Sequence, residues 1–273
     1  MSATPLVEPV SELMREVART VILPVFGTAE IFEKSPGDLV TEADRASEDI
    51  LTARLPELYD GSRVIGEEAA HADPRVLDGI ADGAVWVVDP LDGTNNFAAG
   101  RRPFAMMVAL LQDDRCLAGW ILDPIADVMW WAQDSGGAWC DGDRVAVAPR
   151  RVVPAAELTG RASVSGLPRG TARHIGASAD DFASLLPGLR CAGAEYPAVM
   201  TGEDDFVVFG RTQPWDHLAG VLFAQEAGGV ALRPDGSEYR ASTHSSRGLV
   251  VARDEATYSV VRDVLFPEEA PQG

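Results

Sequence analysis

The spacing of apolar residues predicts two helices near the start of the chain. Leu13, Val17 and Val21 recur at intervals of four residues between positions 10 and 22. This interval places their side chains on one face of a helix. The segment 44–55 repeats the pattern, so the chain is expected to open with a pair of amphipathic helices.

Short apolar runs follow and predict strands. The runs at 63–65 and 84–88 are rich in β-branched residues, which favour extended backbone. Three more runs, at 104–111, 116–122 and 127–132, are separated by short segments of Asp, Pro and other turn-forming residues. This arrangement predicts an antiparallel meander.

The second half of the chain alternates between the two patterns. Helices are expected at 195–202, 215–228 and 254–266, and strands at 206–209, 230–232 and 248–251. The predicted fold class is therefore α+β, with its helices and strands in layers.

A break in the apolar rhythm between residues 144 and 154 divides the chain. We expect an N-terminal α+β half at 1–150, a C-terminal α/β half at 151–267 and a frayed tail at 268–273. The two halves are expected to pack into one compact unit.

The charge of the chain restricts its partners. Of the 273 residues, 46% are hydrophobic and 24% charged, which is typical of a folded domain. The 23 basic residues against 42 acidic ones give a formal net charge of −19. Such a surface repels nucleic acids and anionic membranes, so we expect neither as a partner. It would also repel a small anionic substrate unless cations were present.

The cysteines and the N-terminal residues show no pattern of a disulfide framework, a zinc site or a targeting signal. The three cysteines lack the spacing of a disulfide framework or a zinc site. Residues 1–9 lack the pattern of a signal peptide, and the run at 104–111 is too short to span a bilayer. We therefore expect a cytoplasmic protein.

The segment WVVDPLDGTNNF carries the most informative chemistry. Asp89 and Asp92 stand around Pro90 at the end of an apolar strand. A plain turn explains Pro90 and Gly93, but it leaves two carboxylates beside a core, which is costly. A divalent cation relieves their repulsion, and Mg²⁺ prefers oxygen ligands such as carboxylates and the Leu91 carbonyl. The metal site is the favoured interpretation.

The backbone after these acids suits an anion. The N–H groups of Gly93, Thr94 and Asn95 are expected to form a nest or a helix N-terminus that binds phosphate.

Other acids follow apolar strands or begin helices, namely Asp44, Glu67 and Asp216. Each has an ordinary alternative explanation, such as an N-cap at Thr41 or Asp44 or a helix dipole for Asp216. Their joint presence is what favours a shared metal site. For His217, beside Asp216, we expect a partly exposed residue rather than a ligand.

Together these motifs resemble the inositol monophosphatase-like family of Mg²⁺-dependent, lithium-sensitive phosphatases. The matching segments are DLVTEAD, IGEE, WVVDPLDGTNNF and WDHLAG, in the same order and at similar separations over nearly the whole chain. The resemblance implies a layered αβαβα sandwich of the sugar-phosphatase type, assembled as a homodimer.

The resemblance also implies two metal sites. Glu67, Asp89 and the Leu91 carbonyl would hold one Mg²⁺. Asp89, Asp92 and Asp216 would hold the second.

The resemblance further implies catalytic roles. Gly93 and Thr94 would bind phosphate through their N–H groups. Asp44 would hydrogen-bond Thr94, and with Glu67 this pair would orient and deprotonate the attacking water. The full set of expected substrate-binding residues is Gly93, Thr94, Asn95, Glu195 and Asp216.

The residues expected to recognise the part of the substrate beyond the phosphate depart from the family pattern. Members that hydrolyse inositol phosphates carry small residues after the glycine that matches Gly193, where this chain has Glu195 and Tyr196. They also carry a Glu where this chain has Phe209. We hypothesise that Glu195 supplies the missing carboxylate, the alternative being a solvated glutamate at a helix start.

The predicted function is that of a Mg²⁺-dependent phosphomonoesterase. Its substrate would be a small phosphorylated polyol such as inositol monophosphate, attacked by metal-activated water. Histidinol phosphate, nucleoside 3′,5′-bisphosphate and fructose 1,6-bisphosphate are alternatives. A bisphosphate would require basic residues, for which the candidates are Arg101, Arg102, Arg190 and Arg211. A metal-binding regulatory protein without catalysis is the alternative from another class.

Overall fold

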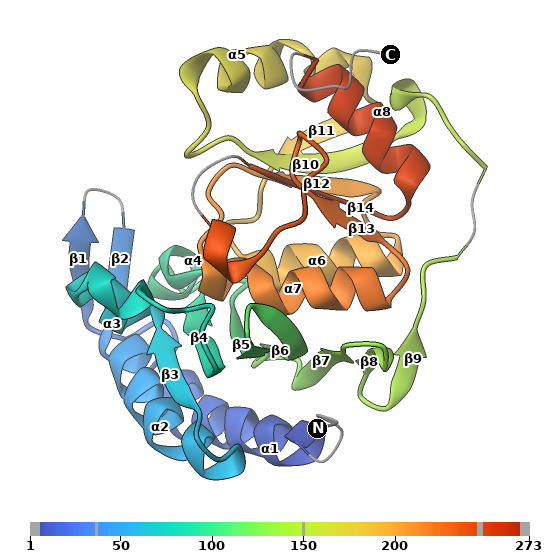
Figure 1. Cartoon of the computed structure of the whole chain (residues 1–273). Helices are drawn as coiled ribbons and strands as arrows, with labels where there is room; N and C mark the ends of the chain where they lie inside the picture. The colour runs from blue at the N-terminus through green and yellow to red at the C-terminus, as the bar shows by residue number, and fades with distance from the viewer. Residues whose placement is uncertain (1–5, 36–37, 149–150, 245–247, 268–273) are drawn as a thin grey trace.

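The computed structural model describes residues 6–35, 38–148, 151–244 and 248–267. Helices and sheets alternate in five layers, which confirms the layered α+β prediction (Figure 1). The boundary expected at residue 150 and the tail expected at 268–273 lie outside the described residues. Among the described residues, no helix is long and apolar enough to cross a bilayer.

A seven-stranded sheet forms the second layer, in the order β3-β4-β5-β6-β7-β8-β9. Its strands are β3 (Arg63–Gly66), β4 (Ala84–Asp92), β5 (Ala105–Gln112), β6 (Arg115–Asp123), β7 (Val128–Gln133), β8 (Gly137–Cys140) and β9 (Asp143–Val145). β3 and β4 are parallel and the remaining pairs are antiparallel. The predicted meander is confirmed, and two strands that the apolar pattern did not predict, β8 and β9, extend it.

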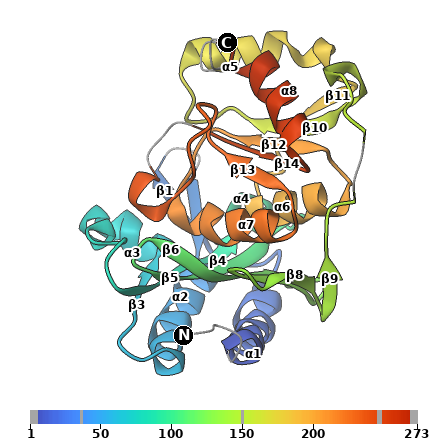
Figure 2. The same cartoon turned by 45° about the vertical axis from the view of Figure 1, so that its right-hand side comes forward.

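Two helices, α1 (Val7–Val17) and α2 (Glu42–Leu58), cover the outer face of this sheet (Figure 2). The side chains of β4 alternate between its two faces: Trp86 and Val88 pack with these helices, and Val85 and Val87 pack in the core on the other side. Because both faces are buried, the first five residues of β4, 84–88, are apolar without a break.

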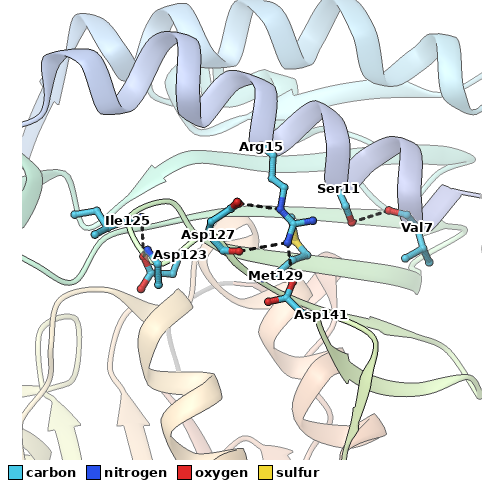
Figure 3. A network of polar contacts seen from close by, with 9 residues as sticks. Val7, Ser11, Arg15, Asp123, Ile125, Asp127, Met129 and Asp141 are labelled. Atoms are coloured by element: carbon cyan, nitrogen blue, oxygen red, sulfur yellow. Dashed lines mark hydrogen bonds and ion pairs between the residues drawn. The ribbon is translucent and has the colours of Figure 1, made fainter.

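Ion pairs also attach the solvent-facing side of α1 to two turns of the sheet. The Arg15 guanidinium contacts the Asp127 carboxylate at 2.9 Å and the Asp141 carboxylate at 2.6 Å (Figure 3). Asp141 Oδ1 also accepts the Met129 N–H at 3.2 Å. These contacts join the helix to the β6–β7 turn and to the turn between β8 and β9.

The middle layer consists of α6 (Ala192–Thr201) and α7 (Pro214–Glu226), which lie between the two sheets (Figure 2). α7 buries side chains on all sides, including Leu218 and Phe223. A Cβ at Gly119 of β6 would lie 2.7 Å from the Ala219 Cα, so glycine lets α7 approach the sheet closely.

The second sheet has five strands in the order β11-β10-β12-β14-β13. The strands are β10 (Thr159–Ser163), β11 (Ser184–Pro187), β12 (Phe206–Phe209), β13 (Val230–Leu232) and β14 (Leu249–Ala252). β11, β10 and β12 run parallel, so their carboxyl ends meet at one edge of the sheet. The outer layer is formed by α5 (Arg169–Ala177) and α8 (Glu255–Leu265).

Four shorter strands and helices remain among the described residues. They are β1 (Ile31–Ser35), β2 (Asp38–Thr41), α3 (Glu67–Ala72) and α4 (Thr94–Ala98). β1 and β2 pair antiparallel as a sheet of their own.

Candidate active site

Three carboxylates meet where β4 reaches the first turn of α7. Oxygen atoms of Asp89, Asp92 and Asp216 lie within 4.8 Å of one another. Asp89 is 1% exposed and Asp92 9%. The structure therefore brings together all three acids that the resemblance assigned to the second metal.

The local backbone explains how Asp89 and Asp92 meet. Residues three apart on a regular strand point to opposite faces. Here the register of β4 against β5 shifts between Asp89 and Asp92, which turns both carboxylates toward a common point. Pro90, which has no N–H to donate, stands inside this irregularity. The Leu91 N–H donates to Asp89 Oδ1 at 2.9 Å.

The electrostatics of the cluster favour a bound cation. Burial raises the pKa of Asp89 well above its usual range, and the charges of Glu67, Asp92 and Asp216 raise it further. Burial also raises the pKa of Asp92, to about 7. Buried acids that repel one another are stabilised by a multivalent cation. The donor set, which consists of oxygen atoms, fits a hard divalent metal ion.

Glu67 is the first residue of α3. Its charge acts on Asp89, although it lies outside the group of three that meets within 4.8 Å. The N–H groups of Glu68 and Ala69 each donate at 2.8 Å to the Glu48 carboxylate of α2. A Cβ at Gly66 would lie 2.1 Å from Glu48 Cδ. Glu48 and Gly66 thus fix the position from which Glu67 projects.

Asp44 and Thr94 are brought together as the resemblance implied. Thr94 Oγ1 lies 3.0 Å from Asp44 Oδ1 and 2.9 Å from the Leu91 carbonyl oxygen, and its single hydrogen serves one of them at a time. The other Asp44 oxygen accepts the Thr41 N–H at 2.8 Å in a capping box that begins α2. Burial raises the pKa of Asp44 to about 6, against the lowering effect of the bonds from Thr41.

Gly93 occupies a position that only glycine fills easily. Its φ is +89°, and an added Cβ would lie 3.1 Å from the Pro103 carbonyl oxygen. Gly93 caps α4, whose first residues are Thr94 and Asn95, and all three residues line a cavity of about 490 Å³ that also holds the acid cluster. This cavity is the candidate active site.

The cavity is also lined by Glu195, which is 2% exposed, so the alternative of a solvated glutamate is wrong. Glu195 Oε1 accepts the Leu189 N–H at 2.8 Å. Burial raises the pKa of Glu195 to about 8. Phe209 lines the same cavity and stacks on the Tyr196 ring with 5.3 Å between centroids.

His217 is 1% exposed, which corrects the expectation of a partly exposed residue. Its Nε2 lies 2.9 Å from the Arg211 carbonyl oxygen and its Nδ1 lies 3.0 Å from Tyr196 Oη. Burial lowers the pKa of His217 to about 4. The neutral ring therefore donates from Nε2 and accepts at Nδ1.

Of the four candidate arginines, Arg190 and Arg211 line the cavity. Arg101 and Arg102 do not, and Arg102 pairs instead with Asp123 at 2.9 Å.

The sequence pattern did not indicate Ser163 and Ser165, which line the cavity at the end of β10. It missed them because β10 itself has no apolar alternation.

Comparison with known proteins reveals relatives over nearly the whole chain. The model of the inositol monophosphatase family matches residues 4–265. A Nus factor SuhB of Pseudomonas aeruginosa is 30% identical over 97% of this chain and 98% of its own. An inositol-1-monophosphatase of Mesorhizobium japonicum is 31% identical over 81% of this chain and 80% of its own. Thermotoga maritima IMPase TM1415 has the same fold, with a TM-score of 0.79 at 23% identity, covering 97% of this chain and 100% of that chain.

Proposed function

The chain belongs to the inositol monophosphatase family and is a phosphoric monoester hydrolase; on that premise we propose that it uses Mg²⁺ to hydrolyse a small phosphorylated polyol. Members of this family depend on metal ions. The observation that carries the proposal is the buried cluster of Asp89, Asp92 and Asp216, which meets beside a glycine-capped helix start in one cavity.

The acids would hold the metal ions. Asp89, Asp92 and Asp216 would ligate one Mg²⁺, and Glu67 with Asp89 and the Leu91 carbonyl a second. When bound, Mg²⁺ neutralises phosphate charge and activates the attacking water.

The remaining residues bind phosphate and move a proton. The N–H groups of Gly93 and Thr94, with that of Asn95, would hold the phosphate oxygens. The Thr94 hydroxyl would orient the attacking water and accept a proton from it, while passing its own proton to Asp44 Oδ1, 3.0 Å away. A carboxylate whose pKa is near 6 is suited to accept this proton close to neutral pH. Glu195, which lines the same cavity, would contact a substrate hydroxyl.

A phosphate-release assay tests the proposal. The panel contains inositol 1-phosphate, histidinol phosphate, a nucleoside 3′,5′-bisphosphate and fructose 1,6-bisphosphate, each with and without Mg²⁺. We expect release that requires Mg²⁺ and falls at least about a hundredfold in Asp89→Asn, because a charged ligand of the metal is removed. Mg²⁺ binding without release from any ester would instead favour a regulatory protein.

The family resemblance also supports a homodimer. Sedimentation of the full chain tests this state, and a single species of one-chain mass would contradict it.

A further inference from the structure

The parallel strands of the second sheet bring two arginines to the cavity. Arg190 follows β11 and Arg211 follows β12, and both are exposed residues that line the same cavity as the acid cluster. Ligands of open sheets bind beyond the carboxyl ends of parallel strands, which is where these residues lie. Among the described residues, neither guanidinium forms an ion pair, although the charge of Arg211 acts on the Asp216 carboxylate and opposes the rise of its pKa.

The backbone at Arg190 is strained. Its φ of +60° is a left-handed conformation that costs about 1 kcal/mol for a residue with a long side chain. The other described non-glycine residues with positive φ are Asp or Ser.

The peptide before Arg190 is held from both sides, which maintains this strain. The Leu189 N–H donates to Glu195 at 2.8 Å, and the Leu189 carbonyl accepts from Asn96 Nδ2 at 3.0 Å. Strain maintained beside a site indicates that the side chain is needed there.

The backbone at Arg211 is also anchored by buried groups. Its carbonyl accepts from His217 Nε2 at 2.9 Å, and the next carbonyl, of Thr212, accepts from Tyr239 Oη at 3.0 Å. A Cβ at Gly166 would lie 2.8 Å from Arg211 Cγ, so glycine leaves room for the arginine stem. Both arginines are therefore presented from rigid backbone.

Arg190 and Arg211 bring more positive charge to the cavity than the recognition of a neutral polyol requires. In the proposed function, the phosphate to be hydrolysed would already be matched by the metal ions and by the N–H groups of Gly93 and Thr94. A guanidinium matches a carboxylate or phosphate in a bidentate fashion, and it is a poor choice for reading a hydroxyl alone. A cavity of about 490 Å³ has room for a small substrate with two anionic ends.

We propose that the substrate carries a second anionic group, a phosphate or a carboxylate, which Arg190 and Arg211 hold while the first phosphate is hydrolysed. This inference rests on the proposed phosphatase function. It narrows that function from phosphorylated polyols in general to phosphate esters with two anionic groups.

The test compares substrates with one and two anionic groups. Values of kcat/KM are measured with Mg²⁺ for inositol 1-phosphate, for fructose 1,6-bisphosphate as the phosphate arm, and for 3-phosphoglycerate as the carboxylate arm. The proteins are wild type, Arg190→Gln, Arg211→Gln and the control Arg102→Gln, which lies outside the cavity. Circular dichroism and thermal midpoints establish that each variant is folded.

We expect the wild type to prefer at least one substrate with two anionic groups. For each protein we divide the kcat/KM of the preferred substrate by the kcat/KM of inositol 1-phosphate. Arg190→Gln and Arg211→Gln should each lower this ratio about tenfold, because each variant loses one charged hydrogen bond to the second anionic group. Arg102→Gln should leave the ratio unchanged. The arm that shows the preference identifies the second group as phosphate or carboxylate.

Two outcomes overturn the inference, and they are distinguishable from failure of the proposed function. Hydrolysis of inositol 1-phosphate with no preference for a second anion refutes the inference alone. Equal losses on all three substrates would place the arginines on the scissile phosphate, which also refutes it. Absence of hydrolysis of every ester by the wild type refutes the phosphatase function itself.

Discussion

Replacing Gly66 with Ala should displace the Glu48 carboxylate and loosen the start of α3. The added Cβ would lie 2.1 Å from Glu48 Cδ and 2.3 and 2.5 Å from its oxygens, closer than any real contact. The backbone itself tolerates alanine, since φ at Gly66 is −104°. The cost is therefore the loss of the bonds that Glu48 accepts.

The magnitude follows from those bonds. Glu48 accepts two N–H groups at 2.8 Å, from Glu68 and Ala69, and is 7% exposed. A hydrogen bond to a charged group contributes about 1.5–3 kcal/mol, so losing both costs about 3–6 kcal/mol in the free energy of unfolding. Because Glu67 begins the same helix, the Mg²⁺ concentration needed for half-maximal activity should also rise.

Urea unfolding followed by tryptophan fluorescence, without metal, measures the effect. Gly170→Ala is the matched control, because a Cβ there meets no atom within 4 Å. The decisive comparison repeats Gly66→Ala in a Glu48→Ala background, where the clash is gone and the cost should fall below about 1 kcal/mol. An equal cost in both backgrounds would refute the reasoning.

Two further predictions concern charge. Mg²⁺ at about a hundred times its dissociation constant should stabilise the wild type by about 2.7 kcal/mol, which thermal melts detect as a rise in the midpoint of unfolding. The rise should be smaller in Asp92→Asn, and an equal rise in both proteins would exclude Asp92 as a ligand. Burial raises the pKa of Glu195 from 4.5 to about 8, so the stability linked to its proton is present below pH 4.5 and is lost as pH rises toward 8. Metal-free Glu195→Gln should therefore gain stability relative to wild type between pH 5 and 8 in denaturant titrations, and a constant difference across that range would contradict the buried, protonated carboxyl.

The apolar pattern predicted strands and helices well where burial is continuous. β12 (Phe206–Phe209) and β13 (Val230–Leu232) have the bounds expected from sequence. β10 (Thr159–Ser163) was missed because its packing selects small residues: a Cβ at Gly160 would lie 2.6 Å from the Phe206 ring. Such a strand has no hydrophobic signature of its own.

The candidate site was predictable as a set of acids but not as a geometry. The motif around Asp89 and Asp92 indicated a metal, yet only the shifted register of β4 shows how both carboxylates face one point. Glu48 falls within the segment 44–55, whose pattern predicts an ordinary amphipathic helix. Its burial depends on α3, which is more than a dozen residues away in sequence, so no local pattern could reveal it.

The two walls of the cavity come from different parts of the chain. The acids belong mainly to β4 and the start of α7, whereas Arg190 and Ser165 come from connections that follow β11 and β10. A connection can change in sequence without moving the strands that it joins. Evolution could therefore exchange the substrate by altering these connections while keeping the hydrolytic chemistry, which makes this chain a candidate for redirecting specificity by exchange of short segments.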